Sequence, residues 1–184
     1  MRRPILMLVL LMLCGSALAH PGHPGEGALA GLWHPLSGAD HLLAMVAVGL
    51  WAACQRGAAR WALPLSFVAF MLAGFLSPAL PGVEPMIAVS VLTLGLAVAA
   101  AVRLPAWAGA AIVAAFALFH GNAHVAELPA GAHVAGFAAG MLLTTALLHA
   151  AGVGLGLSLG RANAWLPRAL GGAVSVFGTY LLLA

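Results

Sequence analysis

The sequence predicts an all-α membrane protein, in which a cleavable signal peptide is followed by a bundle of about six transmembrane helices. Of the 184 residues, 64% are hydrophobic and only 6% are Asp, Glu, Lys or Arg. A soluble domain carries about 25% charged residues, so this chain cannot cover itself with a polar surface, and we expect membrane lipids to surround it. The net charge of +3 is too small for a nucleic-acid surface, and a chain without lysine has no Walker motif for a nucleotide.

Residues 1–19 have the features of a cleavable signal peptide. The segment MRR is positively charged, ILMLVLLML is an apolar core too short to span a bilayer comfortably, and ALA before His20 fits the small-x-small cleavage rule. An uncleaved first helix is the alternative. Cleavage after ALA would leave residues 20–33 as a periplasmic leader that contains His20 and His23.

Residues 34–184 are predicted to form the membrane domain. The chain divides into apolar stretches of about the twenty residues that a spanning helix needs, and the segments between them contain most of the charge and much of the proline. The helices are expected at about 35–54, 62–80, 85–102, 106–126, 131–155 and 164–183.

The charged residues of this topology separate onto two sides. The positive-inside rule places the arginine side in the cytoplasm, and a cleaved signal delivers the mature N-terminus to the opposite side. We therefore expect a multi-pass protein of the bacterial inner membrane with a periplasmic N-terminus. The arginines of one side are Arg56, Arg60, Arg103, Arg161 and Arg168, and the glutamates of the other side are Glu26, Glu84 and Glu127.

Histidines are unusually frequent, and they gather on the outer side. Of the eight, only His149 lies apart, in the inner half of the fifth predicted helix. Placing an ionisable residue in a membrane segment costs free energy, so such residues usually have a functional role. Besides the two in the leader, the outer histidines are His34, His41, His120, His124 and His133.

The first pair lies at the start of the first predicted helix. Seven positions separate His34 from His41, so on one helix they would nearly eclipse. Because Pro35 suits a first helical position, His34 is expected to cap this helix. Asp40 projects about 100° away from His41, which leaves it available to orient a ligand or to face another helix.

The second group closes the fourth predicted helix. His120 and His124 are one turn apart, Glu127 follows one turn later, and all three fall within about 60° of each other. Two histidines at this spacing can chelate one metal ion, and a carboxylate can be a further ligand or can orient one. Nitrogen and oxygen ligands suit Ni²⁺, Co²⁺ or Zn²⁺ better than a soft ion.

Two segments carry a resemblance to a known family. These segments are HPLSGADHLLAMVAVGLWAA (34–53) and FHGNAHVAELPAG (119–131). They resemble motifs of the HupE/UreJ family of hydrogenase and urease accessory proteins, which are nickel permeases. The resemblance spans the chain and implies Ni²⁺ uptake for a metalloenzyme, with Co²⁺ as an alternative cargo, no fixed cofactor and no enzymatic activity. Val125 stands where the family pattern has glycine, which bears on selectivity more than on metal binding. By the motif match the metal path contains His34, Asp40, His41, His120, His124 and Glu127; topology adds His133, and His20 and His23 fit the family's leader.

Two other classes of function stay open at this stage. One alternative is an intramembrane hydrolase with a zinc site that activates water, although the sequence lacks H-E-x-x-H. The residues that could form this zinc site are Ser37, Asp40, His41, His120 and His124. A metal-binding sensor or chaperone without transport is the other alternative. The sequence leaves open Ni²⁺ against Co²⁺, the energy coupling, the recipient enzyme and the oligomeric state.

Overall fold

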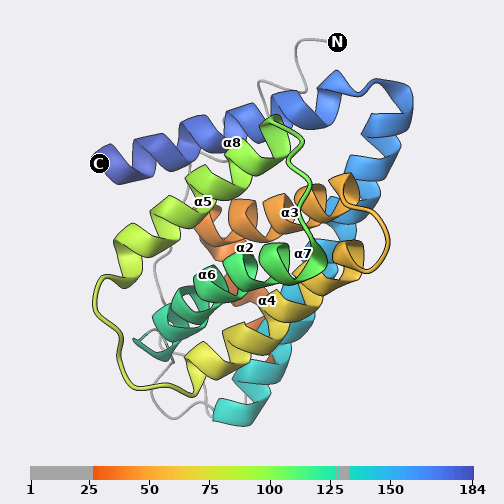
Figure 1. The fold of residues 1–184 in the computed structure, drawn as a ribbon. Helices are drawn as coiled ribbons and strands as arrows, with labels where there is room; N and C mark the ends of the chain where they lie inside the picture. Colours follow the sequence, from red (N-terminus) through yellow and green to blue (C-terminus); the bar gives the residue numbers. More distant parts are fainter. Residues whose placement is uncertain (1–26, 127, 129–132) are drawn as a thin grey trace.

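The computed structural model describes residues 27–126, 128 and 133–184, and these residues form seven α-helices without a β-strand (Figure 1). The predicted all-α class is thereby confirmed. The predicted signal peptide, with His20 and His23 after it, and Glu127 lie outside the described residues. The helices are α2 (Gly27–Ser37), α3 (Ala39–Cys54), α4 (Ala59–Phe75), α5 (Val83–Ala99), α6 (Ala106–Ala126), α7 (Val134–Ala162) and α8 (Trp165–Leu183).

The described helices have the apolar character of a membrane protein. Three of them, α6, α7 and α8, are long and apolar enough to cross a bilayer, and α2 with α3 would make a fourth span if this bent pair counts as one. Helices α4 and α5 are apolar but have 17 residues each, the lower limit for a span. The number of transmembrane helices, about six, therefore stays a prediction.

The first membrane helix differs from the prediction. Instead of one helix over 35–54 there are two, α2 and α3, which are bent by 82° at the break between them. Residues 27–33, assigned above to the leader, form the first part of α2. His34 does not cap a helix, because both it and Pro35 lie in the last turns of α2.

Local hydrogen bonding explains the break. Gly38 is extended, with φ −99° and ψ 121°, and it precedes the first turn of α3. The Ser37 hydroxyl donates to the carbonyl oxygen of His34 at 2.6 Å and thus satisfies a group that the end of α2 leaves open. A Cβ at Gly38 would lie 2.7 Å from Oδ1 of Asp40, so glycine leaves room for the Asp40 side chain to fold back over the break.

Two other helices end away from their predicted limits. Helix α4 stops at Phe75, five residues early, where Ser77 caps the Gly74 carbonyl with its hydroxyl at 2.7 Å and Pro78 opposes further helix. Helix α7 continues to Ala162, seven residues beyond the prediction, and ends where Asn163 is extended, with φ −162° and ψ 124°.

Close backbone contacts join the helices into three sets: α2 with α3 and α7, α4 with α6, and α5 with α8 (Figure 1). A Cβ at Gly49 of α3 would overlap the carbonyl oxygen of His149 in α7, and a Cβ at Gly121 of α6 would overlap that of Met71 in α4. Such glycines let helices approach without side chains between them. The buried core, which includes Trp51 and Phe67, lies where the sets meet.

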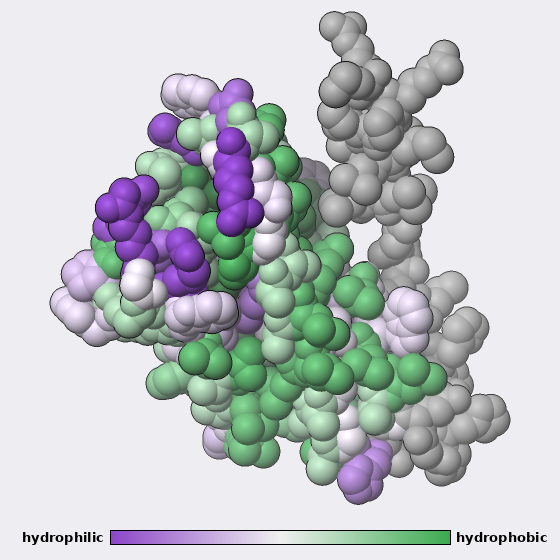
Figure 2. All heavy atoms as spheres, turned by 90° about the vertical axis from the view of Figure 1, so that its right-hand side faces the viewer, coloured by the Kyte–Doolittle hydropathy of each residue, from purple (hydrophilic) through white to green (hydrophobic). Residues whose placement is uncertain are grey.

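The surface divides into a broad apolar area and a hydrophilic end. Figure 2 shows hydrophilic residues gathered toward one end, with mostly hydrophobic surface over the rest of this face. Large apolar side chains are exposed on the exterior of the protein, with Trp107 76% and Leu183 83% accessible. An apolar exterior of this kind is what the hydrocarbon core of a bilayer requires.

Candidate functional site

Four of the predicted metal residues come together between α2, α3 and α6. The ring centroids of His34 and His124 are 4.5 Å apart, and those of His41 and His124 are 4.7 Å apart. The rings of His41 and His120 follow at 4.9 Å. The structure thus joins two motifs that are about eighty residues apart in the sequence.

The break at Gly38 makes this arrangement possible. It places the end of α2 and the start of α3 against the last turns of α6, so that His34 and His41 reach α6 from different helices. His41 is 7% exposed, and His120 and His124 are completely buried. The cluster is therefore shielded by protein on most sides.

Asp40 fixes the protonation of the His41 ring. Its Oδ1 accepts the backbone N–H of His41 at 2.8 Å and lies 3.0 Å from Nδ1 of the same residue. Because this carboxylate oxygen acts as an acceptor, Nδ1 carries the proton, and Nε2 of the neutral ring keeps its lone pair. Nε2 is buried and has no hydrogen-bond partner within the described structure.

Ser90 of α5 fixes His120 in a comparable way. The Ser90 hydroxyl lies 2.7 Å from the carbonyl oxygen of Ile87 and 2.8 Å from Nε2 of His120. The hydroxyl has one proton, which it must donate to the carbonyl, so it accepts a hydrogen bond from Nε2–H. The lone pair of His120 is therefore on Nδ1, which is buried without a partner among the described residues.

These assignments leave two buried imidazole lone pairs in neighbouring rings. A neutral imidazole nitrogen is the form that binds transition metals, and a carboxylate on the other ring nitrogen orients such a ligand and makes it more basic. In the described ranges, no three His, Cys, Asp or Glu side chains are grouped so that they could hold one metal ion. The described cluster thus offers pairs of nitrogen ligands rather than a closed cage.

A carboxylate cavity adjoins the cluster. Asp40 and Glu84 both line a cavity of about 260 Å³ between the starts of α3 and α5 and the end of α8. The sequence placed Glu84 on the outer side without assigning it to the metal path. The available signal was its position in the first turn of an apolar helix, on the same side of the membrane as Asp40.

Phe67 contacts both the cluster and a further histidine, His149. The Phe67 ring lies 5.5 Å from that of His120 and 5.0 Å from that of His149, so it contacts both histidines. His149 is 2% exposed, and neither ring nitrogen has a hydrogen-bond partner within the described structure. Nearby, the Thr145 hydroxyl lies 3.4 Å from the sulfur of Met45 and 3.5 Å from that of Met71.

Other predicted residues lie elsewhere. His133 is exposed at the start of α7, where Nδ1 accepts the backbone N–H of Gly136 at 3.0 Å, so this nitrogen serves as a helix cap. Val125 is 41% exposed and lies on the surface of α6. Ser37, which the hydrolase alternative would use, donates its hydroxyl to a backbone carbonyl. Glu127, outside the described residues, stays a predicted ligand.

The chain is similar to a known protein and matches a known family. The chain is 45% identical over 181 residues to Protein HupE of Rhizobium leguminosarum bv. viciae, and the match covers 96% of this chain and 95% of that protein. No solved structure is significantly similar to the chain. The family model for HupE / UreJ protein matches residues 8–181, and the chain therefore belongs to the HupE/UreJ family.

Proposed function

We propose that this protein is an inner-membrane permease that takes up Ni²⁺, with Co²⁺ as an alternative cargo, for a metalloenzyme such as hydrogenase or urease. Membership of a family of transport-type accessory proteins for these enzymes supports this function. The observation that carries the proposal is the pair of buried lone pairs on His41 and His120, which Asp40 and Ser90 hold in metal-binding tautomers.

The ion enters through the cavity of Asp40 and Glu84. Two carboxylates at one cavity raise the local concentration of a divalent cation and offset its charge as it leaves bulk water. Asp40 also holds the His41 ring, so one side chain separates the entry cavity from the histidine cluster.

The histidines then replace part of the hydration shell. Nε2 of His41 and Nδ1 of His120 supply two nitrogen ligands of the type that Ni²⁺ and Co²⁺ accept. An ion that gains only two protein ligands keeps most of its water and is held weakly. A transport site needs this balance, because it must bind well enough to select an ion and loosely enough to release it.

The inward path passes Phe67 and reaches His149. The Phe67 ring contacts both His120 and His149, so we propose that it moves when an ion passes from the cluster to His149. The membrane potential supplies about 2.3 kcal/mol per charge per 100 mV, and about twice that for a divalent ion. We propose that this energy drives uptake, since the sequence has no nucleotide-binding motif.

The test is uptake of ⁶³Ni²⁺ into proteoliposomes that contain the full-length protein, with an inside-negative potential on and off. We expect uptake that rises with the potential and is lost in His41→Ala and in His120→Ala. His133→Asn is the matched control, because it removes an exposed imidazole at the start of α7 while the asparagine oxygen can still cap that helix, and we expect its uptake to match the unsubstituted protein.

Competition with excess Co²⁺ and Zn²⁺ would then rank the metals. Inserted protein that binds Ni²⁺ without moving it inside would refute the permease proposal and favour a sensor or chaperone. Metal-dependent lipid hydrolysis in the same vesicles would favour the hydrolase instead.

A further inference from the structure

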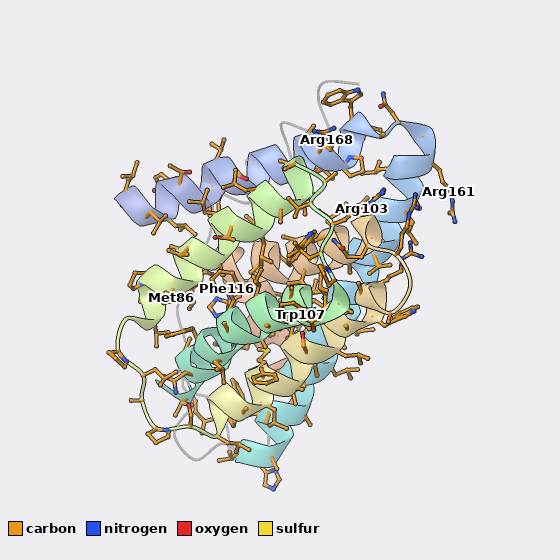
Figure 3. All side chains as sticks on the ribbon, viewed as in Figure 1. Met86, Arg103, Trp107, Phe116, Arg161 and Arg168 are labelled. Atoms are coloured by element: carbon orange, nitrogen blue, oxygen red, sulfur yellow. The ribbon has the colours of Figure 1, made fainter. Side chains whose placement is uncertain are left out.

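A second cavity lies at the end of the helices opposite to the histidine cluster. It has a volume of about 310 Å³, and three arginines from separate segments line it. Arg103 follows α5, Arg161 lies in the last turn of α7, and Arg168 lies in the first turn of α8. Figure 3 shows these three arginines at the same end of the molecule.

Two of the guanidinium groups are held in place by the backbone. Nε of Arg103 donates to the carbonyl oxygen of Cys54 at 3.1 Å, and Nε of Arg168 donates to that of Ala99 at 2.8 Å. These bonds satisfy carbonyls at the ends of α3 and α5. They leave the terminal nitrogens of both side chains without hydrogen bonds to the described residues, and such planar groups match the oxygens of a phosphate.

The charge of this cavity is not neutralised within the described part of the chain. The only carboxylates there, Asp40 and Glu84, line the cavity at the other end. No ion pair between arginine and a carboxylate occurs among the described residues. Three positive charges around one cavity therefore favour an anionic ligand.

The rest of the lining is apolar, and one glycine keeps it open. Leu157, Ala164 and Pro167 contribute apolar surface beside the arginines. A Cβ at Gly160 would meet only Cγ of Pro167, at 3.9 Å, so Gly160 is not needed for helix packing. The cavity thus offers an apolar surface directly next to the positive charge.

The length of α7 and an exposed tryptophan suit a cavity at the depth of lipid headgroups. Helix α7 has 29 residues, which corresponds to a length of about 43 Å, whereas the hydrocarbon core is about 30 Å thick. The helix is therefore long enough for its last turn, which contains Arg161, to extend past the hydrocarbon. Trp165 is exposed, and its ring lies 4.6 Å from the Arg168 guanidinium; tryptophan is typical of this interfacial layer.

We propose that this cavity binds the phosphate of an anionic phospholipid, such as phosphatidylglycerol, with the arginines around the headgroup and an acyl chain along the apolar lining. Free phosphate shares the anionic chemistry but would not use the apolar lining. The proposal is independent of the transported ion, since it uses none of the residues of the histidine cluster.

The experiment uses full-length protein purified in an uncharged detergent, and it measures the thermal unfolding midpoint during titration with lipid. We expect phosphatidylglycerol to raise the midpoint in a saturable way. Phosphatidylcholine with the same acyl chains and millimolar inorganic phosphate should leave it unchanged. An equal rise with phosphatidylcholine, or with inorganic phosphate alone, would overturn the lipid proposal.

Three variants locate the site. Arg161→Gln should weaken the apparent affinity for phosphatidylglycerol about fivefold. This factor corresponds to a binding free energy of about 1 kcal/mol, which is what one arginine contributes near anionic lipid. Gly160→Leu keeps all three arginines but fills the cavity, and it should weaken binding at least as much. Arg56→Gln is the matched control, because Arg56 is exposed outside the cavity lining.

The proposal requires the cavity variants to differ from the control. Unchanged lipid affinity in both Arg161→Gln and Gly160→Leu would overturn it. So would an equal loss in Arg56→Gln, because lipid binding would then reflect the general positive charge of this end.

Discussion

Replacement of Asp40 by asparagine separates the charge of this side chain from its hydrogen bonds. An asparagine oxygen can still accept both bonds that Oδ1 makes, one from the backbone N–H of His41 and one from its ring. The His41 ring should therefore keep its orientation and its tautomer. What the variant lacks is one negative charge behind a metal-binding nitrogen.

The size of the effect follows from the geometry. An ion on Nε2 of His41 would lie about 7 Å from Oδ1 of Asp40, given the 3.0 Å hydrogen bond, the width of the ring and a metal–nitrogen bond of about 2.1 Å. At an effective dielectric constant of about 20, a divalent ion and one carboxylate at this distance attract each other by about 5 kcal/mol. This value is an upper limit, because the Asp40 side chain is 26% exposed and water screens it.

Carboxylates that orient metal-bound histidines typically contribute 10- to 100-fold to metal affinity or activity, and we expect a loss within this range. The assay is the initial rate of ⁶³Ni²⁺ uptake as a function of Ni²⁺ concentration in proteoliposomes. Asp40→Asn should raise the concentration for half-maximal uptake by 10- to 100-fold. Its thermal unfolding midpoint should change little, because both hydrogen bonds remain. Inserted Asp40→Asn protein with the half-maximal concentration of the unsubstituted protein would refute the role assigned to the carboxylate.

Three further substitutions test the structural account. Ser90→Ala leaves Nε2–H of His120 buried without an acceptor. We therefore expect the free energy of unfolding to fall by about 1–3 kcal/mol and Ni²⁺ uptake to be slower. Stability and uptake equal to those of the unsubstituted protein would contradict the assigned tautomer. Asn122→Ala removes four hydrogen bonds to the end of α4 and to the connection between α4 and α5. Chemical denaturation should show that the free energy of unfolding falls by more than about 2 kcal/mol. A smaller change would mean that this connection contributes little to stability. Gly49→Ala puts a methyl group into the backbone of α7, whereas the methyl group of the control variant Gly154→Ala would meet nothing within 4 Å. Size-exclusion chromatography should show a lower yield of folded protein for Gly49→Ala but not for Gly154→Ala. Equal yields of the two variants would refute the close contact.

The helices were predictable where an unbroken apolar run ends at strong signals. Helix α6 begins and ends at the predicted residues, after Pro105 and before a segment with Glu127 and Pro129. Hydropathy does not report a bend, so the sequence predicted one helix where α2 and α3 meet at 82°. That bend depends on the room that Gly38 leaves for the Asp40 side chain, which is a three-dimensional property.

The site was predictable in its residue types but not in its contacts. The motif match names the four histidines that meet, whereas the prediction that His34 caps the helix of His41 is wrong, because the two residues belong to different helices. Ser90 was missed because a serine in an apolar helix commonly bonds the carbonyl three or four residues earlier. Its second contact, with His120, depends on how α5 packs against α6.

The packing of the helices in sets has a mechanical consequence for the histidine cluster. His34 and His41 belong to the set of α2, α3 and α7, whereas His120 and His124 belong to the set of α4 and α6. All three histidine–histidine ring pairs therefore join one set to the other. The glycine contacts resist sliding within a set, so a rocking motion between the two sets would open or close every histidine pair in a single step.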